Sequence, residues 1–451
     1  MVRHDVFAQP VSLGDPDTLD AWNAMALAFL AHGAATPLHL GTLLDRAPGH
    51  AAGHAIRGLF YALLGRRETL AEARRAHATA RALPPGVARE AALVEALGHV
   101  LARRPSAAIA TLETVLDRAP GDTLLLKLGH ALRFVIGDAP GMRRSIERCR
   151  PAHDPDHPGH GYLLGCLAFA LEETGDHAAA IRAGRAALDH SPDDAWGLHA
   201  VAHVHDMTGD AAGGLDWLEG REAAWAHCNN FRFHVWWHKA LMLIDLGRLD
   251  AALALYDAEV RAERTDDYRD IANATSLLSR LELEGVDVGG RWAELADIAE
   301  RRTEDGCLVF ADLHYMLALT GDRRVASAAL LARIARDADA PRDEVDATMG
   351  SPGLAAARGL TLFAEGAYDA AFAALTLARP AMQRAGGSHA QRDVFERITI
   401  DAGLRAGHLD AARSLIDDRE RRRGGREDGY AATRRRLLAD AERLCRTAAR
   451  A

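Results

Sequence analysis

The sequence is poor in cysteine, lysine and aromatic residues, and it has no long apolar run. Its 451 residues include five cysteines, which are far apart and form no C-x-x-C pair. This pattern excludes a disulfide-stapled scaffold and favours a reducing compartment. No stretch of about 18 uncharged apolar residues occurs, and no basic segment followed by an apolar one opens the chain. We therefore expect a cytoplasmic protein that does not enter a membrane.

The charge balance argues against nucleic acid as a partner. Lysine occurs only as Lys127 and Lys239, and 54 basic residues face 63 acidic ones, which gives a net charge of −9. No long basic stripe occurs before the C-terminal tail, so the electrostatic footprint of a nucleic-acid-binding surface is missing. Frequent alanine, with arginine in place of lysine, suggests a bacterial source. Histidine is abundant instead, with 22 residues.

Apolar residues recur at spacings of three and four throughout, which predicts an all-α protein. A glycine, usually followed by a polar residue, recurs between amphipathic segments, as expected where one helix ends and the next begins. Spacings of 38, 34 and 38 residues separate four of these glycines, from Gly137 to Gly247. The full set comprises Gly65, Gly137, Gly175, Gly209, Gly247, Gly321, Gly366 and Gly407.

Residues 161–194 match the tetratricopeptide pattern, with small residues at Ala168, Ala180, Gly184 and Ala187 where two helices must approach closely. Such hairpins stack into an α-solenoid, because one hairpin cannot bury its apolar face alone. We expect three parts: divergent N-terminal helical repeats over 1–110, a tetratricopeptide-like solenoid with a concave pocket over 111–420, and a charged capping helix over 421–451.

The repeat frame places several histidines on one face. Positions three or four apart share a helix face, which groups Trp196, His199, His203 and Asp206. The following repeat adds His234, Trp236, Trp237 and His238, so two HxxxH pairs are expected to face one groove together with Asp206 and the tryptophans. Rings and imidazoles suit a small polar ligand better than an acidic peptide.

Three interpretations of this cluster stay open. His199, His203, His234 and His238 can act with Asp206 as catalytic acids and bases, because the pKa of imidazole is close to neutrality. The same four histidines can instead hold a divalent zinc, manganese or iron ion. They can also be interior groups that bridge helices, although each buried imidazole then needs hydrogen-bond partners.

Later segments add candidates for substrate binding. Asp312 and His314 stand in a helical segment where apolar residues are expected. Because they are two residues apart, they lie on different faces of that helix. Ser388 is a natural N-cap, and the first turn after it, with His389, Gln391, Arg392 and Asp393, favours an anion. Arg392 either clamps a substrate carboxylate or pairs with an aspartate.

Several segments resemble the tetratricopeptide repeat protein 38 family, over roughly residues 120–420. The similar runs are DAWGLHAVAHVHDMTGDAAGGLDWLE, NNFRFHVWWHKALMLIDLGRLDAALALYD, GCLAFALEETGDHAAA, TSLLSRLELEGVDVGGRW, FADLHYMLALTGD and GGSHAQRDVF. The resemblance implies a helical-repeat fold but no reaction. It implies a core of His199, His203, Asp206, Trp225, Asn230, His234, Trp236, Trp237, His238, Asp312, His314, Ser388, His389, Gln391, Arg392 and Asp393.

We therefore expect a small polar molecule to bind the His/Trp/Asp pocket, with acid–base hydrolysis, elimination or isomerisation as its chemistry. The 312–314 and 388–393 segments are expected to complete the same cavity. A scaffold that holds a protein partner in an open groove is the main alternative, and a metal-dependent enzyme is the second.

Overall fold

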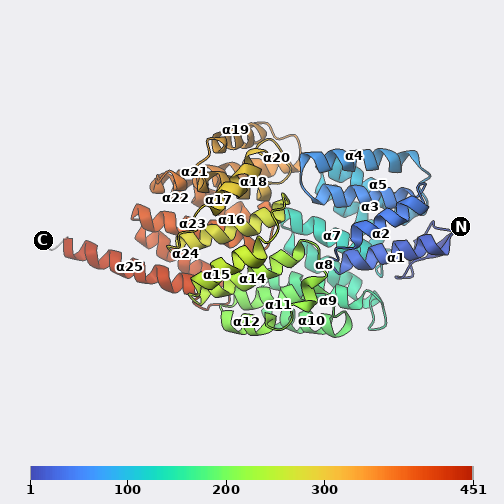
Figure 1. Cartoon of the computed structure of the whole chain (residues 1–451), viewed down its shortest axis with the longest axis horizontal. Coiled ribbons are helices and arrows are strands. Elements are labelled where there is room, and N and C mark those ends of the chain that lie inside the picture. The colour runs from blue at the N-terminus through green and yellow to red at the C-terminus, as the bar shows by residue number, and fades with distance from the viewer. Residues whose placement is uncertain (1, 449–451) are drawn as a thin grey trace. The chain divides into compact units, whose positions relative to one another are not determined.

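The computed structural model of the protein describes residues 2–448, and helices make up nearly all of its secondary structure (Figure 1). Two short strands, β1 (Arg3–His4) and β2 (Pro10–Val11), pair antiparallel near the N-terminus. The prediction of an all-α fold is confirmed.

The chain forms two compact units. The first runs up to Val201 and takes in Gly220–Arg232 and Pro341–Ala347, whereas the second holds Ala202–Glu219, Phe233–Ala340 and the chain from Thr348 onward. The divisions expected at residues 110 and 420 come from sequence pattern alone and stay predictions, and residues 449–451 of the expected capping helix lie outside the described part of the chain.

The helices follow one another through short turns. Those of the first unit are α1 (Pro16–Leu30), α2 (Thr36–Arg46), α3 (Ala51–Leu63), α4 (Arg67–Ala82), α5 (Ala88–Leu101), α6 (Pro105–Leu116), α7 (Thr123–Ile136), α8 (Ala139–Cys149), a 3-10 turn (Arg150–Ala152), α9 (His160–Glu173), α10 (His177–His190) and α13 (Ala223–Ala226). Helix α11 (Ala195–Met207) begins in the first unit and ends in the second, α14 (Phe231–Asp245) does the same, and α20 (Glu344–Thr348) lies at the return from the first unit to the second.

The remaining elements belong to the second unit. They are α12 (Ala211–Leu218), α15 (Leu249–Leu255), a π turn (Tyr256–Val260), α16 (Tyr268–Leu283), α17 (Arg291–Glu300), α18 (Val309–Gly321), α19 (Ala326–Asp339), a π turn (Met349–Gly353), α21 (Leu354–Ala364), α22 (Tyr368–Ala378), a 3-10 turn (Arg379–Ala385), α23 (His389–Ala406), α24 (Leu409–Arg422) and α25 (Gly429–Ala448).

Glycine followed by aspartate makes a recurrent turn between two helices. Gly137 ends α7 with a left-handed φ of 72°, which costs glycine little. Asp138 then caps α8, because its side chain accepts a hydrogen bond from the Gly141 N–H at 2.9 Å. The same arrangement occurs at Gly175 with Asp176 and at Gly209 with Asp210.

Gly321 differs from the other predicted turn glycines. It is the last residue of α18 and has no left-handed φ, and Arg323 takes that conformation with φ of 53°. A Cβ on Gly321 would lie 2.5 Å from Cδ2 of Trp292. Glycine is needed there because the indole packs against the backbone. The helix ends at Gly321 as predicted, but Arg323 and not the glycine supplies the left-handed turn residue.

The expected close approach of helices occurs around α10. Ala168, Ala180 and Ala187 are fully buried. A Cβ added to Gly184 would lie 2.9 Å from the main-chain oxygen of Gly197 and 3.4 Å from the Cβ of Ala168. The small residues therefore let α10 pack closely on both α9 and α11.

The final helix α25 is charged, as expected, but one face of its first half is buried. Tyr430 and Leu438 belong to an apolar cluster with Ile400 and Ile416. Arg434 is 1% exposed, and its guanidinium lies 4.3 Å from the Tyr430 ring centroid. An arginine that the sequence places on a solvated helix is thus an interior group.

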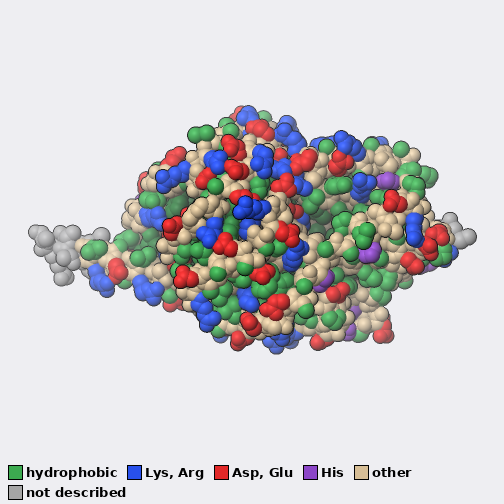
Figure 2. Space-filling view, in the orientation of Figure 1, with side chains coloured by type: hydrophobic (Ala, Val, Ile, Leu, Met, Phe, Trp, Pro, Cys, Tyr) green, Lys and Arg blue, Asp and Glu red, His purple; other side chains and the backbone are tan. Residues whose placement is uncertain are grey.

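The surface carries both signs of charge. Basic and acidic side chains are interspersed over the face shown in Figure 2. Among residues 2–448, no helix combines the length and apolar character that a membrane crossing requires.

Candidate functional site

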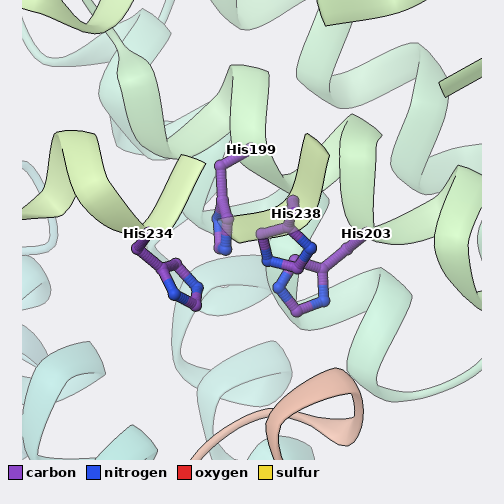
Figure 3. Close-up of side chains that lie close together, drawn as sticks. All are labelled: His199, His203, His234 and His238. Carbon is purple, nitrogen blue, oxygen red and sulfur yellow. The ribbon is translucent and has the colours of Figure 1, made fainter. Parts of the chain in front are cut away.

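The two histidine pairs lie on α11 and α14, and each pair is spaced by one helical turn. His199 and His203 come from α11, and His234 and His238 come from α14. Residues four apart share a helix face, so each pair presents two rings in the same direction. Figure 3 shows the four rings pointing toward one another.

The four imidazoles come close enough to share one ion. One ring nitrogen from each residue lies within 4.8 Å of the other three. In a tetrahedral site with metal–nitrogen bonds of about 2.0–2.1 Å, the ligand nitrogens are about 3.3 Å apart, so small side-chain rotations would suffice. The ring centroids of His203 and His238 are 4.3 Å apart, and those of His234 and His238 are 4.8 Å apart. Because α11 is one continuous helix, His199 stays one turn before His203.

Asn273 fixes the orientation of the His234 ring. Its Oδ1 lies 2.8 Å from His234 Nδ1, so the imidazole donates from Nδ1 and presents the lone pair of Nε2. Metal-binding histidines are commonly oriented by such a bond on the other ring nitrogen.

Burial keeps the imidazoles of α14 neutral. It lowers the pKa of His234 to about 3, against an opposing contribution from the Asn273 hydrogen bond. Burial also lowers the pKa of His238 well below its usual range, and the neighbouring His203, His234 and Arg280 lower it further. A neutral imidazole is a metal ligand, whereas an imidazolium is not. With so low a pKa, neither ring holds the proton that a general acid needs near pH 7.

The cluster is mostly enclosed. His199 is 1% exposed, His203 and His238 are 0% exposed, and His234 is half-buried. Water or a ligand would therefore approach the four rings from the side of His234.

Helix α16 packs behind α14 and holds Trp237 in place. The Trp237 ring stacks on His234, with centroids 5.1 Å apart and planes 16° apart. Its indole N–H donates to Ser276 Oγ at 3.0 Å, and the Arg280 guanidinium lies 5.5 Å from its ring centroid. Trp237 thus supports the cluster and does not line an open groove floor.

Sequence reasoning missed these supporting residues of α16. Asn273, Ser276 and Arg280 are separated by three and four positions and share one face. They are 2%, 1% and 1% exposed, which makes a polar stripe on a buried helix. That stripe is visible in the run NATSLLSRLE and is the signal that could have identified them.

The other predicted tryptophans contact neighbouring side chains, and their role in substrate binding stays a prediction. Trp196 stacks on His32 at 5.3 Å, and the amine of Lys127 lies 4.7 Å from its ring centroid. Trp225 is 1% exposed, and half-buried Trp236 carries the Lys239 amine 5.2 Å from its ring centroid. Trp196 is also 5.0 Å from His199, so it borders the histidine cluster on α11.

Asp206 pairs with an arginine from far along the chain. The guanidinium of Arg423 donates to the Asp206 main-chain oxygen at 2.5 Å and to its carboxylate at 3.3 Å. The predicted His/Asp pair therefore gives way to an ion pair between α11 and the segment after α24.

Asp312 and His314 bond to different partners, as their spacing predicts. The Asp312 carboxylate lies 2.5 Å from the Arg333 guanidinium, and burial raises the pKa of Asp312 to about 6. His314 Nδ1 lies 3.0 Å from Thr275 Oγ1 on α16, and burial lowers its pKa to about 3.

The predicted N-cap at Ser388 is confirmed. Its Oγ accepts from the Gln391 N–H at 3.2 Å, and Gln391 Oε1 accepts from the Ser388 N–H at 3.0 Å. This reciprocal pair is a capping box, so both side chains serve the start of α23.

Arg392 and Asp393 do not use each other as partners. Asp393 accepts from Arg397 at 2.7 Å and from Arg419 at 2.6 Å. Arg392 donates to the main-chain oxygens of Gly386 and Gly387 and lies 3.4 Å from the Nδ1 of His389.

Arg280 connects the start of α23 with α14. Its guanidinium donates to the Ala390 main-chain oxygen at 2.7 Å and lies 4.0 Å from the Asp393 carboxylate. Because the same side chain packs on Trp237, the 388–393 segment and the histidines of α14 are supported by one helix. The expected composite site of the 312–314 and 388–393 segments with the histidines stays a prediction.

No family model matches the chain. The resemblance to the tetratricopeptide repeat protein 38 family therefore rests on the quoted segments and stays a prediction.

Proposed function

We propose that His199, His203, His234 and His238 bind one divalent transition-metal ion, and that the protein uses this ion to act on a small polar molecule. The convergence of one nitrogen from each ring within 4.8 Å carries the proposal. Neutral imidazoles suit zinc and iron, whereas magnesium and calcium prefer oxygen ligands. Manganese also prefers oxygen, so it fits this donor set less well.

A bound ion would supply a Lewis acid and a water of lowered pKa, which is the chemistry of metal-assisted hydrolysis. The four histidines would hold the ion, and water or a substrate would have to reach it between their rings. The half-buried ring of His234 marks the side from which it can enter.

Acid–base chemistry without metal receives less support. It needs imidazoles that gain and lose a proton near pH 7, whereas burial holds the pKa of His234 at about 3. A protein-binding scaffold would make no use of four converging imidazoles. Such a scaffold predicts a metal-free protein that retains its partner in a pull-down when the histidines are replaced.

Elemental analysis of protein purified without a histidine tag tests the proposal. We expect close to one equivalent of zinc or iron in the wild type, and less than about a tenth of that in a His203→Ala/His238→Ala double variant. His408→Ala is the matched control, because His408 is exposed and pairs with Asp369. It should keep the full equivalent.

Zinc added to chelator-stripped protein provides a second readout. A ligand at a hundred times its Kd stabilises the folded state by about 2.7 kcal/mol. Wild type and His408→Ala should show the corresponding rise in Tm, and the double variant should not. A wild type that contains no metal and shows no rise would refute the metal centre.

A further inference from the structure

One exposed face of α4 forms, with the end of α5, a hollow on the protein surface. The hollow has a volume of about 530 Å³ and lies within the first unit. This volume is within the range of ligand sites, about 300–1,000 Å³. Its lining is basic and apolar, without an acidic side chain: Arg74, His77, Ala78, Arg81, Ala82, Leu101 and Ala102.

The sequence of α4 explains the shape of this hollow. Its basic residues, Arg74, His77 and Arg81, are spaced by three and four and therefore share one side of the helix. The alanines beside them, Ala78 and Ala82, are exposed and too short to fill the space between the long side chains. Seven residues of helix rise about 10 Å, so the backbone positions of the two arginines are about 10 Å apart.

The charge of the two arginines is not cancelled within the structure. Both residues are exposed. Among the described residues 2–448, neither has an ion pair or a hydrogen bond to a carboxylate, whereas the adjacent Arg75 pairs with Glu72. The last carbonyls of α5 contribute a partial charge of about −0.5 at one end of the hollow. Two guanidiniums outweigh it, so the hollow is positive on a protein with a net charge of −9.

His77 lies between Arg74 and Arg81 along α4. An N–H of its ring donates to the main chain of Val94, and a Cβ on Gly98 would lie 3.0 Å from His77 Nε2, so the imidazole packs against α5. Burial lowers the pKa of His77, and the charge of Arg81 lowers it further. A carboxylate bound beside Arg81 would oppose both effects and raise the pKa of His77.

We infer that this hollow binds a short acidic segment of a partner protein, with one carboxylate at Arg74 and another at Arg81. A polyproline II segment has three residues per turn and rises 3.1 Å per residue. Acidic residues three positions apart are then on the same side and about 9 Å apart, which matches the two arginines. Nucleic acid fits less well, because it is bound through many phosphate contacts along an extended basic surface. The inference does not depend on the metal centre.

NMR of the full-length protein with labelled histidine side chains tests the inference, and the spectrum of His77→Gln assigns the His77 signal. The probe is a blocked, proline- and serine-rich peptide with two glutamates three positions apart, and the control peptide carries glutamines instead. We expect the glutamate peptide to shift the His77 signal saturably and to raise the pKa of His77. The shift should weaken severalfold between about 0.05 M and 0.5 M salt, because exposed charges are screened. No saturable shift at about 5 mM peptide, or an equal shift with the glutamine peptide, overturns the inference.

Substitutions then locate the contact. Each exposed ion pair is worth about two- to fivefold in affinity, so Arg74→Gln/Arg81→Gln should weaken peptide binding about tenfold. Arg46→Gln/Arg75→Gln is the matched control, because these exposed arginines of the same unit already pair with Asp17 and Glu72. It makes the same change in net charge and should bind as the wild type does. Equal weakening by the two double variants would overturn the assignment to the hollow.

A short single-stranded RNA oligonucleotide distinguishes the kind of partner. It is titrated under the same conditions as the glutamate peptide, with the His77 signal as the readout. We expect it to bind no more tightly than the peptide, because the hollow offers three basic groups. Tighter binding of the RNA that is lost in Arg74→Gln/Arg81→Gln would overturn an acidic protein segment as the occupant.

Discussion

Replacing Asn273 by leucine tests whether the histidine cluster is organised to hold a metal. Asn273 offers no ligand to an ion in the cluster, because its Oδ1 accepts the Nδ1 proton of His234 at 2.8 Å. The residue is 2% exposed, and leucine has a similar volume. The substitution therefore removes the hydrogen-bond acceptor and leaves all four imidazoles in place.

Two effects determine the size of the loss. A buried N–H left without an acceptor costs about 1–3 kcal/mol. Loss of a partner that orients a metal-binding histidine typically costs 10–100-fold in metal affinity, equal to about 1.4–2.7 kcal/mol. We expect Asn273→Leu to weaken zinc binding by that factor without abolishing it.

Competition against a zinc chelator of known affinity measures this effect on metal-stripped protein. Ser276→Ala is the matched control from the same helix, because Ser276 bonds Trp237 and not an imidazole. We expect that control to lose less than about threefold, since its effect on His234 is indirect. Zinc binding by Asn273→Leu within threefold of the wild type would refute the orienting role of Asn273.

Two further predictions concern stability. Burial raises the pKa of Asp194 to about 7, so the folded protein binds this proton more tightly than the unfolded chain and loses stability as pH rises from about 4 to 7. The free energy of unfolding of Asp194→Asn, measured by urea unfolding, should therefore rise relative to that of the wild type between pH 5 and pH 8. The expected gain is a few kcal/mol, at roughly 1.4 kcal/mol per pKa unit. The same difference between the two proteins at pH 5 and at pH 8 would contradict this. Gly321→Ala should lower the free energy of unfolding by about 1–3 kcal/mol, because the new methyl group overpacks against Trp292. Gly366→Ala is the control: it has open space around it but a φ of 77°, and it should cost only about 1 kcal/mol. Equal drops in melting temperature for the two variants would show that the indole contact is unimportant.

Local features of this protein could be predicted from its sequence. Glycine followed by aspartate ends one helix and caps the next within five residues, so the turn at Gly137 depends on nothing distant. The same holds for the HxxxH pairs, because four residues of helix fix the direction of both rings. Gly321 ends its helix as predicted, but the reason for the glycine could not be read from the turn pattern, because the need to admit Trp292 arises from a residue 29 positions earlier.

The partners of the candidate residues could not be predicted in the same way. Asp206 stands in register with His203, yet its carboxylate pairs with Arg423, which is 217 residues further along the chain. Asn273 is 39 residues from His234. Such pairings depend on how the helices pack, which helix periodicity does not specify. Arg392 illustrates the limit, because the sequence left open an ion pair between it and an aspartate. In the structure, the carboxylate of the adjacent Asp393 accepts hydrogen bonds from Arg397 and Arg419 instead.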